Sequence, residues 1–367
     1  MWRKFCAIAL TSLAIAFEPF VVAEGAATLP VSQNQANNSP APPRFSLGAE
    51  EACPFGQPFL PDGQISFQNS SRFRVYTTGN GGNSWLFEGS NLDNLQPYPV
   101  VSGQQVPILA PGKFHDDKNY CGMTCILPGY QTGYIAICHY EYHPYGHGIP
   151  SIFSVGLAKS PDGIHWTDCG KVLRGILDPP TVPSNSPNVG AGEPSAMIVN
   201  FSDGSSLTPY IMCWYSDVGP LPGLHVARSR YSLEGADGTW EKWGFGRWQP
   251  PSQTAISEPV ILGSNAHVSF NTLLRRFIVV YTSNDGFYSR TSYDGIHWGR
   301  SSRVLTFPVP LDQLKAGDPG YAYPTLISPN CSNQQESSQV GYLYYAMSPH
   351  WKQAPHTCYR RHFQLSQ

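Results

Sequence analysis

The sequence predicts an all-β protein and, within that class, a five-bladed β-propeller. Three observations support this prediction. The 367 residues include 35 glycines and 34 prolines, and 13% of them are aromatic, which is typical of short strands joined by tight turns. The segments "SPDGIHWTDCGKVL", from Ser160, and "SYDGIHWGRSSRVL", from Ser292, are nearly identical. Short apolar and aromatic stretches also recur in the same order along the chain.

The spacing of the repeated segment gives the size of the repeating unit. Its two copies start 132 residues apart, and "HVARSRYSLEGADGTWEKW" near the midpoint keeps a Gly-rich turn and Trp240. One unit therefore has about 66 residues, and dividing 48–367 by five gives about 64. Six or seven units would be shorter than this spacing requires, which favours five blades. A β-sandwich with one duplicated hairpin is the alternative. The five expected inner strands begin in the segments 64–67, 122–127, 193–199, 267–270 and 323–327.

The repeated segment itself is predicted to be structural. Asp-Gly forms a tight turn between the outer strands of a blade, and the Trp that follows is expected to pack between neighbouring blades. We therefore assign no chemistry to Asp162, Asp294, His165 or His297.

The chain is expected to be exported. Arg3 and Lys4 precede an apolar run over 5–17, and small residues follow at 23–27, which is typical of a signal peptide over 1–23. The run is shorter than a membrane-spanning helix requires, so no membrane span is expected in the mature chain. Residues 24–47 are rich in Pro, Ala, Asn and Gln and are predicted to be a disordered linker. The propeller is expected over 48–367. The mature protein would be secreted to the extracellular space or to a periplasm.

Cysteine usage agrees with export. Eight cysteines follow the signal peptide, an even number that favours disulfides and few free thiols, although the pairing stays open. Cys121 and Cys125 have no second Cys/His pair at zinc-finger spacing, so no metal site is predicted. Four Asn-x-Ser triplets are candidate glycosylation sites. The net charge of −2 does not indicate a nucleic-acid partner, and we expect a monomer.

The "S-x-DG-x-x-W" turn, which occurs twice, and the five similar units together resemble the five-bladed glycoside hydrolases, which include arabinanases, β-xylosidases and invertases. The resemblance covers about 50–367. A sialidase Asp-box has a residue between Asp and Gly, which is absent here, and the invertase motif Asn-Asp-Pro-Asn-Gly is also absent. The resemblance implies a secreted glycosidase with a carbohydrate substrate.

The resemblance also implies an Asp base on blade one, a pKa-tuning Asp on blade two and a Glu acid on blade three. Asp62, Asp117 and Glu193 stand near the starts of the first three inner strands and match that order. Asp116 and Asp117 cannot both face inward, because neighbours on a strand alternate; we choose Asp117. A base and an acid two blades apart leave room for a water molecule, which is the inverting arrangement.

Other residues are expected to bind the substrate. Trp214, Tyr215 and Tyr321 are aromatic side chains near inner strands that could stack on sugar rings. His267 resembles an axial histidine that some arabinanases place near a calcium ion in the central channel. That calcium is the only cofactor that the resemblance raises, and no other is expected. Glu141, in "HYEYHPYGH", is placed at the rim of the pocket.

Two alternative functions stay open at this point. One is a glycan-binding propeller without catalysis, in which the acids only hydrogen-bond sugar hydroxyls. The other is a glycoside phosphorylase on the same scaffold, which would require a basic phosphate site near the acids. Arg275-Arg276 and Arg360-Arg361 are basic pairs, but they fall in turn or outer-strand contexts.

Overall fold

The computed structural model describes residues 42–54, 66–69, 72–79, 82–146, 150–179, 182–202, 206–252, 255–349 and 356–366. Almost all regular structure in them is β-strand, with two short 3₁₀ turns, η2 (Tyr231–Leu233) and η3 (Leu311–Gln313). None of the described residues forms a helix long and apolar enough to cross a membrane.

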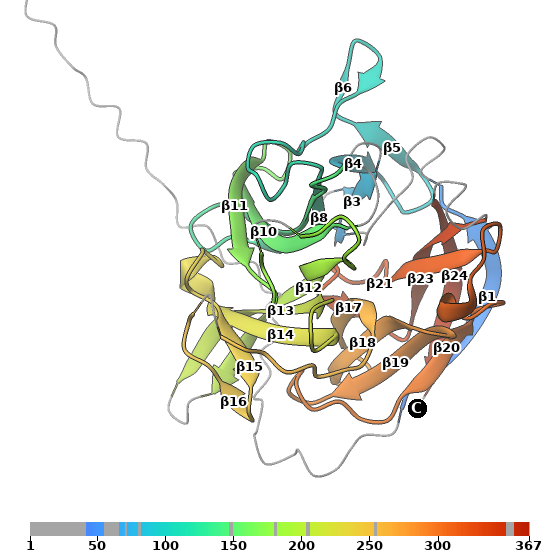
Figure 1. Cartoon of the computed structure of the whole chain (residues 1–367). Helices are drawn as coiled ribbons and strands as arrows, with labels where there is room; N and C mark the ends of the chain where they lie inside the picture. The colour runs from blue at the N-terminus through green and yellow to red at the C-terminus, as the bar shows by residue number, and fades with distance from the viewer. Residues whose placement is uncertain are drawn as a thin grey trace, which may run out of the picture.

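The strand pairings divide into five antiparallel units of four strands, which are the five predicted blades (Figure 1). In the first four blades the innermost strand comes first in the chain. Blade one contains β2 (Ser66–Asn69), β3 (Phe73–Gly79), β4 (Asn83–Gly89) and β5 (Leu95–Tyr98); blade two contains β8 (Tyr120–Pro128), β9 (Tyr134–Tyr142), β10 (Ile152–Ser160) and β11 (Thr167–Leu173); blade three contains β12 (Val189–Ser202), β13 (Leu207–Asp217), β14 (Gly223–Arg230) and β15 (Glu241–Gly244).

Blades four and five complete the ring. Blade four contains β17 (Ser264–Asn271), β18 (Arg276–Ser283), β19 (Gly286–Ser292) and β20 (Ser302–Thr306), and blade five contains β21 (Gly320–Ile327), β23 (Val340–Ser348), β24 (Thr357–Ser366) and β1 (Arg44–Ala52). Blades two and three are joined by two parallel pairs between β10 and β12. The predicted inner strands fall within these elements, apart from residues 64 and 65, which lie outside the described residues.

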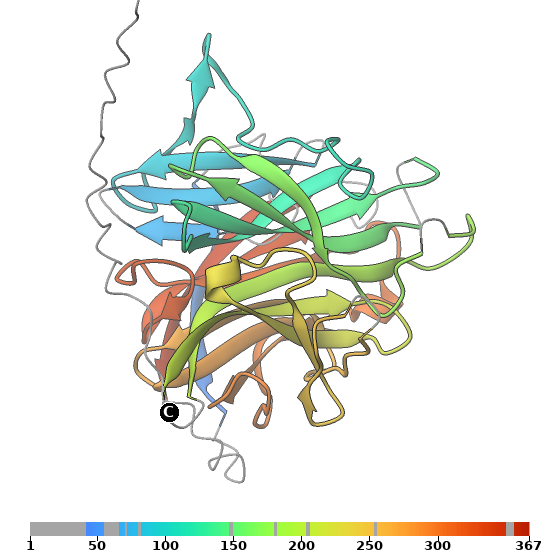
Figure 2. The ribbon, with the colours of Figure 1, turned by 90° about the vertical axis from the view of Figure 1, so that its left-hand side faces the viewer.

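Three short strands lie outside the four-stranded pattern. The hairpin of β6 (Val100–Val101) and β7 (Gln104–Gln105) projects from the rim (Figures 1 and 2). Strand β16 (Arg247–Trp248) extends blade three, and β22 (Glu336–Ser337) pairs with β17.

The start of the fold differs from the prediction. Strand β1 begins at Arg44, inside the segment 24–47 that the sequence predicts as a linker, and it pairs along β24. It supplies the outer strand of blade five, so the two ends of the chain close the same blade. A disulfide between Cys53 and Cys358 joins the end of β1 to the start of β24.

The expectation of few free thiols is wrong. Of the eight cysteines that follow the predicted signal peptide, only Cys53 and Cys358 are bonded to each other. The other six are free: four are buried on strands (Cys121, Cys125, Cys138 and Cys213), Cys331 is buried between β21 and β22, and Cys169 is exposed. The five buried cysteines serve as small apolar side chains in the core.

The repeated segments occupy the predicted turns. Asp162-Gly163 lies between β10 and β11 of blade two, and Asp294-Gly295 lies between β19 and β20 of blade four. The weaker copy around Trp240 lies on blade three, where the indole donates to Gly235 O as Trp166 donates to Gly163 O.

Each Asp-Gly turn also contacts the second strand of the preceding blade. The Tyr76 hydroxyl donates to Gly163 O, and the Trp214 indole donates to Gly295 O. Trp166 packs edge-on against Tyr76. These contacts confirm the prediction that the repeated turn joins neighbouring blades.

A segment between β21 and β23 crosses the centre of the ring. The side-chain amide of Gln334 accepts from Phe67 N and donates to Ile126 O, in blades one and two. The Gln335 side chain accepts from Ile198 N in blade three, and its backbone carbonyl accepts from Phe270 N in blade four. One segment of blade five thus hydrogen-bonds to the other four inner strands and fills the axis there.

Candidate active site

The inner strands of three blades bend near their first residues. Register shifts interrupt β12 between Gly192 and Ser195, β17 between Ser264 and His267, and β21 between Ala322 and Thr325. Within each shift one non-glycine residue has a left-handed backbone: Glu193 (φ 52°), Asn265 (φ 48°) and Tyr323 (φ 59°). Bulges of this kind re-aim a side chain, and left-handed non-glycine residues cluster at functional sites. We call the end of the ring at which the inner strands begin the entry face.

Glu193 is held at the entry face by the blades on both sides of it. Its backbone N–H donates to Nδ1 of His139, on blade two, at 3.1 Å. Its carboxyl group hydrogen-bonds to the side chain of Ser216 and to the backbone of Asn265, on blade four. Burial raises the pKa of Glu193, and it outweighs the opposing effects of His139 and of the hydrogen bond from Ser216. Glu193 therefore holds its proton to higher pH than an ordinary glutamate.

Glu141 interacts electrostatically with this carboxyl group, and its own pKa is shifted in the opposite direction. Its two oxygens contact His139 Nε2 at 2.9 Å and His143 Nε2 at 2.7 Å. Although burial alone would raise it, these two hydrogen bonds bring the pKa of Glu141 down to about 2. Because His139 Nδ1 accepts from Glu193 N, its Nε2 carries the proton and donates to Glu141.

The entry face thus contains one carboxyl group whose pKa is raised by burial and one whose pKa is lowered to about 2. The negative charge of Glu141 also raises the pKa of Glu193. Two carboxyl groups whose environments separate their pKa values are what general acid catalysis requires. The sequence analysis placed Glu141 only at the rim. The position of Glu141 could have been predicted from the topology of a blade, because the second strand runs antiparallel to the inner strand and ends where the inner strand begins. Glu141, near the end of β9, lies opposite Tyr120 at the start of β8.

Asp117 does not join Glu193. Its carboxyl group is fully buried and accepts from Phe114 N at 2.8 Å. It lies near Asp168, whose Oδ1 accepts from the Tyr140 hydroxyl. Tyr140 and His139 are neighbours on β9 and face opposite sides of the sheet. Asp117 and Glu193 therefore lie on opposite faces of blade two, and the predicted tuning role of Asp117 is not supported.

The predicted base, Asp62, lies outside the described residues. Its role stays a prediction, and so does the inverting geometry, which depends on its distance from Glu193.

The aromatic residues predicted to bind sugar are mostly core residues. Trp214 and Tyr215 are fully buried, and their polar atoms bond to Gly295 O and to the Ser257 hydroxyl. Tyr321 is partly buried and stacks on Phe307 at 5.0 Å. Sequence alone did not separate core aromatics from exposed ones, because both types occur on strands of the same pattern.

His267 is also buried, with 2% of its surface exposed, and its Nδ1 accepts from Leu326 N on blade five. Burial lowers the pKa of His267 to about 4, so the ring is neutral at ordinary pH. Its predicted contact with substrate is not supported. Asn265, two residues earlier, occupies the position equivalent to Glu193.

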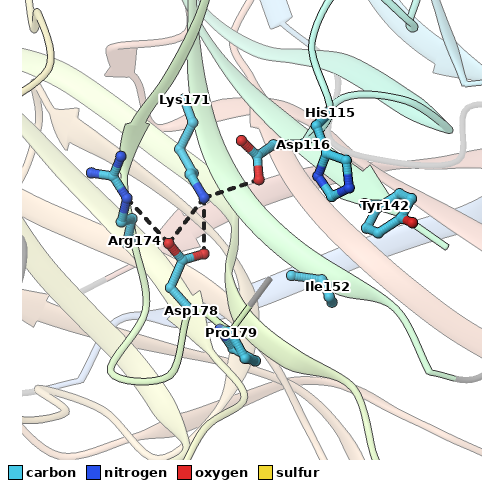
Figure 3. Close-up of a pocket in the computed structure, with 8 residues that line it drawn as sticks. All are labelled: His115, Asp116, Tyr142, Ile152, Lys171, Arg174, Asp178 and Pro179. Atoms are coloured by element: carbon cyan, nitrogen blue, oxygen red, sulfur yellow. Dashed lines mark hydrogen bonds and ion pairs between the residues drawn. The ribbon is translucent and has the colours of Figure 1, made fainter. Parts of the chain in front are cut away.

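A pocket of about 290 Å³ flanks the entry face on blade two (Figure 3). His115 and Tyr142 form one side, with ring centroids 4.1 Å apart. On the other side Lys171 pairs with both Asp116 and Asp178 at 2.9 Å. Its aromatic and charged groups could accept a sugar unit, but its cations are already neutralised by carboxylates. It therefore offers no unpaired basic site of the kind that a phosphorylase requires.

Solved structures with the same architecture are glycoside hydrolases. A family 117 glycoside hydrolase of Zobellia galactanivorans superposes with a TM-score of 0.53 at 13% identity, over 89% of this chain and 92% of that chain. An α-L-arabinofuranosidase of Podospora anserina gives 0.51 at 9% identity, over 92% and 98%. The catalytic domain of a Coprinopsis cinerea family 62 α-L-arabinofuranosidase gives 0.50 at 12%, over 88% and 98%.

This chain has the fold of the five-bladed glycoside hydrolases. At these identities the likeness establishes architecture and leaves the chemistry to the site itself. No protein-family model and no curated protein sequence matches the chain.

Proposed function

We propose that the protein is a secreted glycosidase in which Glu193 is the general acid. The observation that carries this proposal is the placement of Glu193 on a left-handed bulge at the entry face, where His139 links it to Glu141 and burial raises the pKa of its carboxyl group. A glycosidic oxygen is a poor leaving group until it is protonated, so a carboxyl group with a raised pKa is the donor that the reaction needs.

The remaining roles follow from position and charge. Glu141 takes the tuning role, since its charge favours the protonated form of Glu193. His139 positions both groups, because it accepts from the backbone of Glu193 and donates to Glu141. Asp62 is proposed as the base that activates water. With that base the reaction would invert the anomeric centre.

The disulfide between Cys53 and Cys358 and the predicted signal peptide support an extracellular site of action. The substrate class is a plant or microbial polysaccharide or its oligosaccharides. Two structural neighbours are named as α-L-arabinofuranosidases, so arabinofuranosides are the first substrates to test.

The test compares wild type with Glu193→Gln on aryl glycosides and on polysaccharides. The variant should lose at least about 100-fold in turnover on natural glycans, where the leaving group must be protonated. It should lose much less on aryl glycosides with activated leaving groups.

Glu336→Gln is the matched control. Glu336 is also a partly buried glutamate whose pKa is raised by burial, but it lies in β22, in the segment that crosses the axis. It should keep wild-type turnover. Wild-type turnover in Glu193→Gln would refute the assignment, and glycan binding without any turnover by the wild type would favour the non-catalytic alternative.

A further inference from the structure

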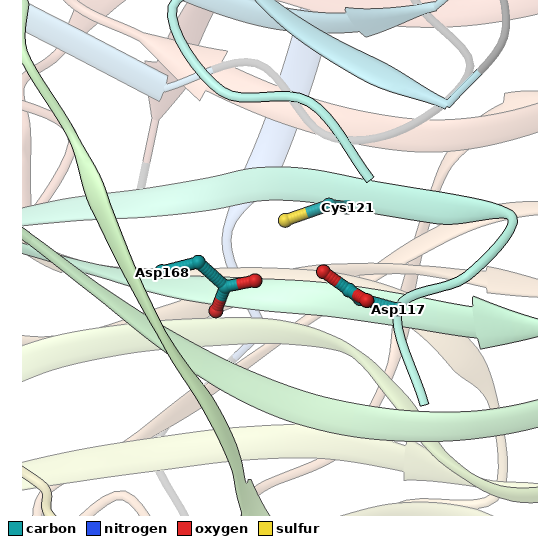
Figure 4. A group of neighbouring side chains, drawn as sticks. All are labelled: Asp117, Cys121 and Asp168. Atoms are coloured by element: carbon teal, nitrogen blue, oxygen red, sulfur yellow. The ribbon is translucent and has the colours of Figure 1, made fainter. Parts of the chain in front are cut away.

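Three side chains that can bind a metal ion meet inside blade two, on the face turned away from Glu193. They are Asp117, Cys121 and Asp168, and one ligand atom from each lies within 4.8 Å of the others. Their exposed fractions are 0%, 0% and 4%. Figure 4 shows the two carboxyl groups and the sulfur directed toward one another.

Each carboxyl group is only half satisfied. Asp117 Oδ1 accepts from Phe114 N, and Asp168 Oδ1 accepts from Gly170 N and from the Tyr140 hydroxyl. Among the described residues, Oδ2 of Asp117 and Oδ2 of Asp168 have no hydrogen-bond donor. A buried carboxylate oxygen without a donor is costly, so either a proton or a cation must lie between these oxygens.

The sulfur distinguishes this group from a simple carboxyl pair. Burial raises the pKa of Cys121, so its thiol keeps its proton unless a cation replaces it, and that thiol is hydrogen-bonded to Cys138. Calcium and magnesium take oxygen ligands, whereas zinc accepts thiolate and carboxylate together. A fourth ligand is available from the Cys138 sulfur or from water, which would complete a tetrahedral set.

We propose that Asp117, Cys121 and Asp168 bind one Zn²⁺ ion. Each side chain offers one ligand atom to the ion. The ion would also satisfy the two buried carboxylate oxygens that lack a donor among the described residues.

The ion would fasten a loop to the sheet. Asp117 belongs to the loop before β8, while Cys121 lies on β8 and Asp168 lies on the outer strand β11. The same loop carries His115 and Asp116, which line the pocket at the entry face. The sequence analysis predicted no metal because it looked for a second Cys/His pair, and here two distant carboxylates take that place.

The experiment loads the full chain with Zn²⁺ or Co²⁺ during refolding, because the site is buried, and then removes free metal by dialysis. Elemental analysis should find one ion per chain. The Co²⁺ form should show the intense near-ultraviolet absorption of a cobalt–thiolate bond, a readout that requires no variant. Wild-type protein that retains no metal and shows no such band would overturn the proposal and leave a shared proton as the occupant.

Variants then identify the ligands. Cys121→Ser should weaken the cobalt–thiolate band, and should abolish it where water is the fourth ligand; Asp168→Asn should reduce retained metal at least tenfold. Cys169→Ser is the matched control, since Cys169 adjoins Asp168 but is exposed, and it should bind as wild type does. Undiminished binding in both ligand variants would overturn the proposal. Neither result depends on glycosidase activity.

Discussion

Glycine-to-alanine substitutions in the two Asp-Gly turns and in one other turn add the same methyl group in three different surroundings. The free energy of unfolding that each substitution removes can therefore be compared. Gly163, Gly295 and Gly246 all have left-handed backbones, with φ of 77°, 74° and 70°. Alanine in this conformation costs about 1–2 kcal/mol, partly offset by about 0.4–1 kcal/mol from the less flexible unfolded chain. Strain alone therefore predicts the same small loss at each position.

What surrounds the added methyl group differs. At Gly246 it meets nothing within 4 Å, so Gly246→Ala should cost only about 1 kcal/mol. At Gly163 it would lie 2.9 Å from Arg74 Nη1 and from the Tyr76 hydroxyl. Both are the ends of side chains that can shift, and the shift costs about one hydrogen bond between them, worth about 0.5–1.5 kcal/mol. Added to the backbone strain of about 1 kcal/mol, this gives Gly163→Ala a cost of about 2 kcal/mol.

At Gly295 the added methyl group would lie 2.7 Å from Cζ2 of Trp214. That indole is fully buried and anchored by its hydrogen bond to Gly295 O, so it cannot rotate away. Overpacking of this kind adds about 1–3 kcal/mol, and Gly295→Ala should cost about 3–4 kcal/mol.

Urea denaturation followed by tryptophan fluorescence would measure all three variants under one protocol. The expected order of the free energy lost is Gly246→Ala, then Gly163→Ala, then Gly295→Ala. A Gly295→Ala protein no less stable than Gly246→Ala would refute the view that the turn is a rigid contact between blades.

Two further predictions concern the entry face and the closure of the ring. Glu141→Gln removes the charge that raises the pKa of Glu193. Glu193 then loses its proton at lower pH, so the alkaline limb of the pH–activity profile should move to lower pH. An unchanged profile would exclude Glu141 from tuning the pKa of Glu193. The Cys53–Cys358 disulfide spans 305 residues. Replacing both cysteines with serine should lower the free energy of unfolding by about 3–5 kcal/mol, measured by urea denaturation with Cys169→Ser as the control. A loss no greater than that of the control would contradict this prediction.

The architecture could be predicted because it repeats. A turn sequence that occurs twice, with a weaker third copy, gave the length of a blade, and short apolar stretches marked the inner strands. Strand β1 was missed because its side chains are mostly exposed and it is held by backbone pairing with β24. No hydrophobic pattern marks a strand of that kind.

The site was predicted less completely. Glu193 was found because a glycine-rich approach to an inner strand indicates a close backbone passage. Asp117 was misplaced because a carboxyl group near a strand start can turn either to the entry face or into the space between blades. His267 was chosen from its place on an inner strand and from the resemblance. The bulge between Ser264 and His267 instead puts Asn265 at the position equivalent to Glu193, and no sequence pattern reports that bulge.

One end of the ring axis is held by hydrogen bonds, whereas the other end contains inner-strand residues with left-handed backbones. Gln334 and Gln335 tie the other four inner strands together through three hydrogen bonds of their side chains and one of the Gln335 backbone carbonyl, which fixes that part of the axis in one arrangement. Toward the entry face, three inner strands leave regular geometry at Glu193, Asn265 and Tyr323. Each such residue costs about 1–3 kcal/mol, and regular strands would avoid that cost. Strain concentrated at one end of an otherwise regular ring is what a site that aims side chains at a ligand requires.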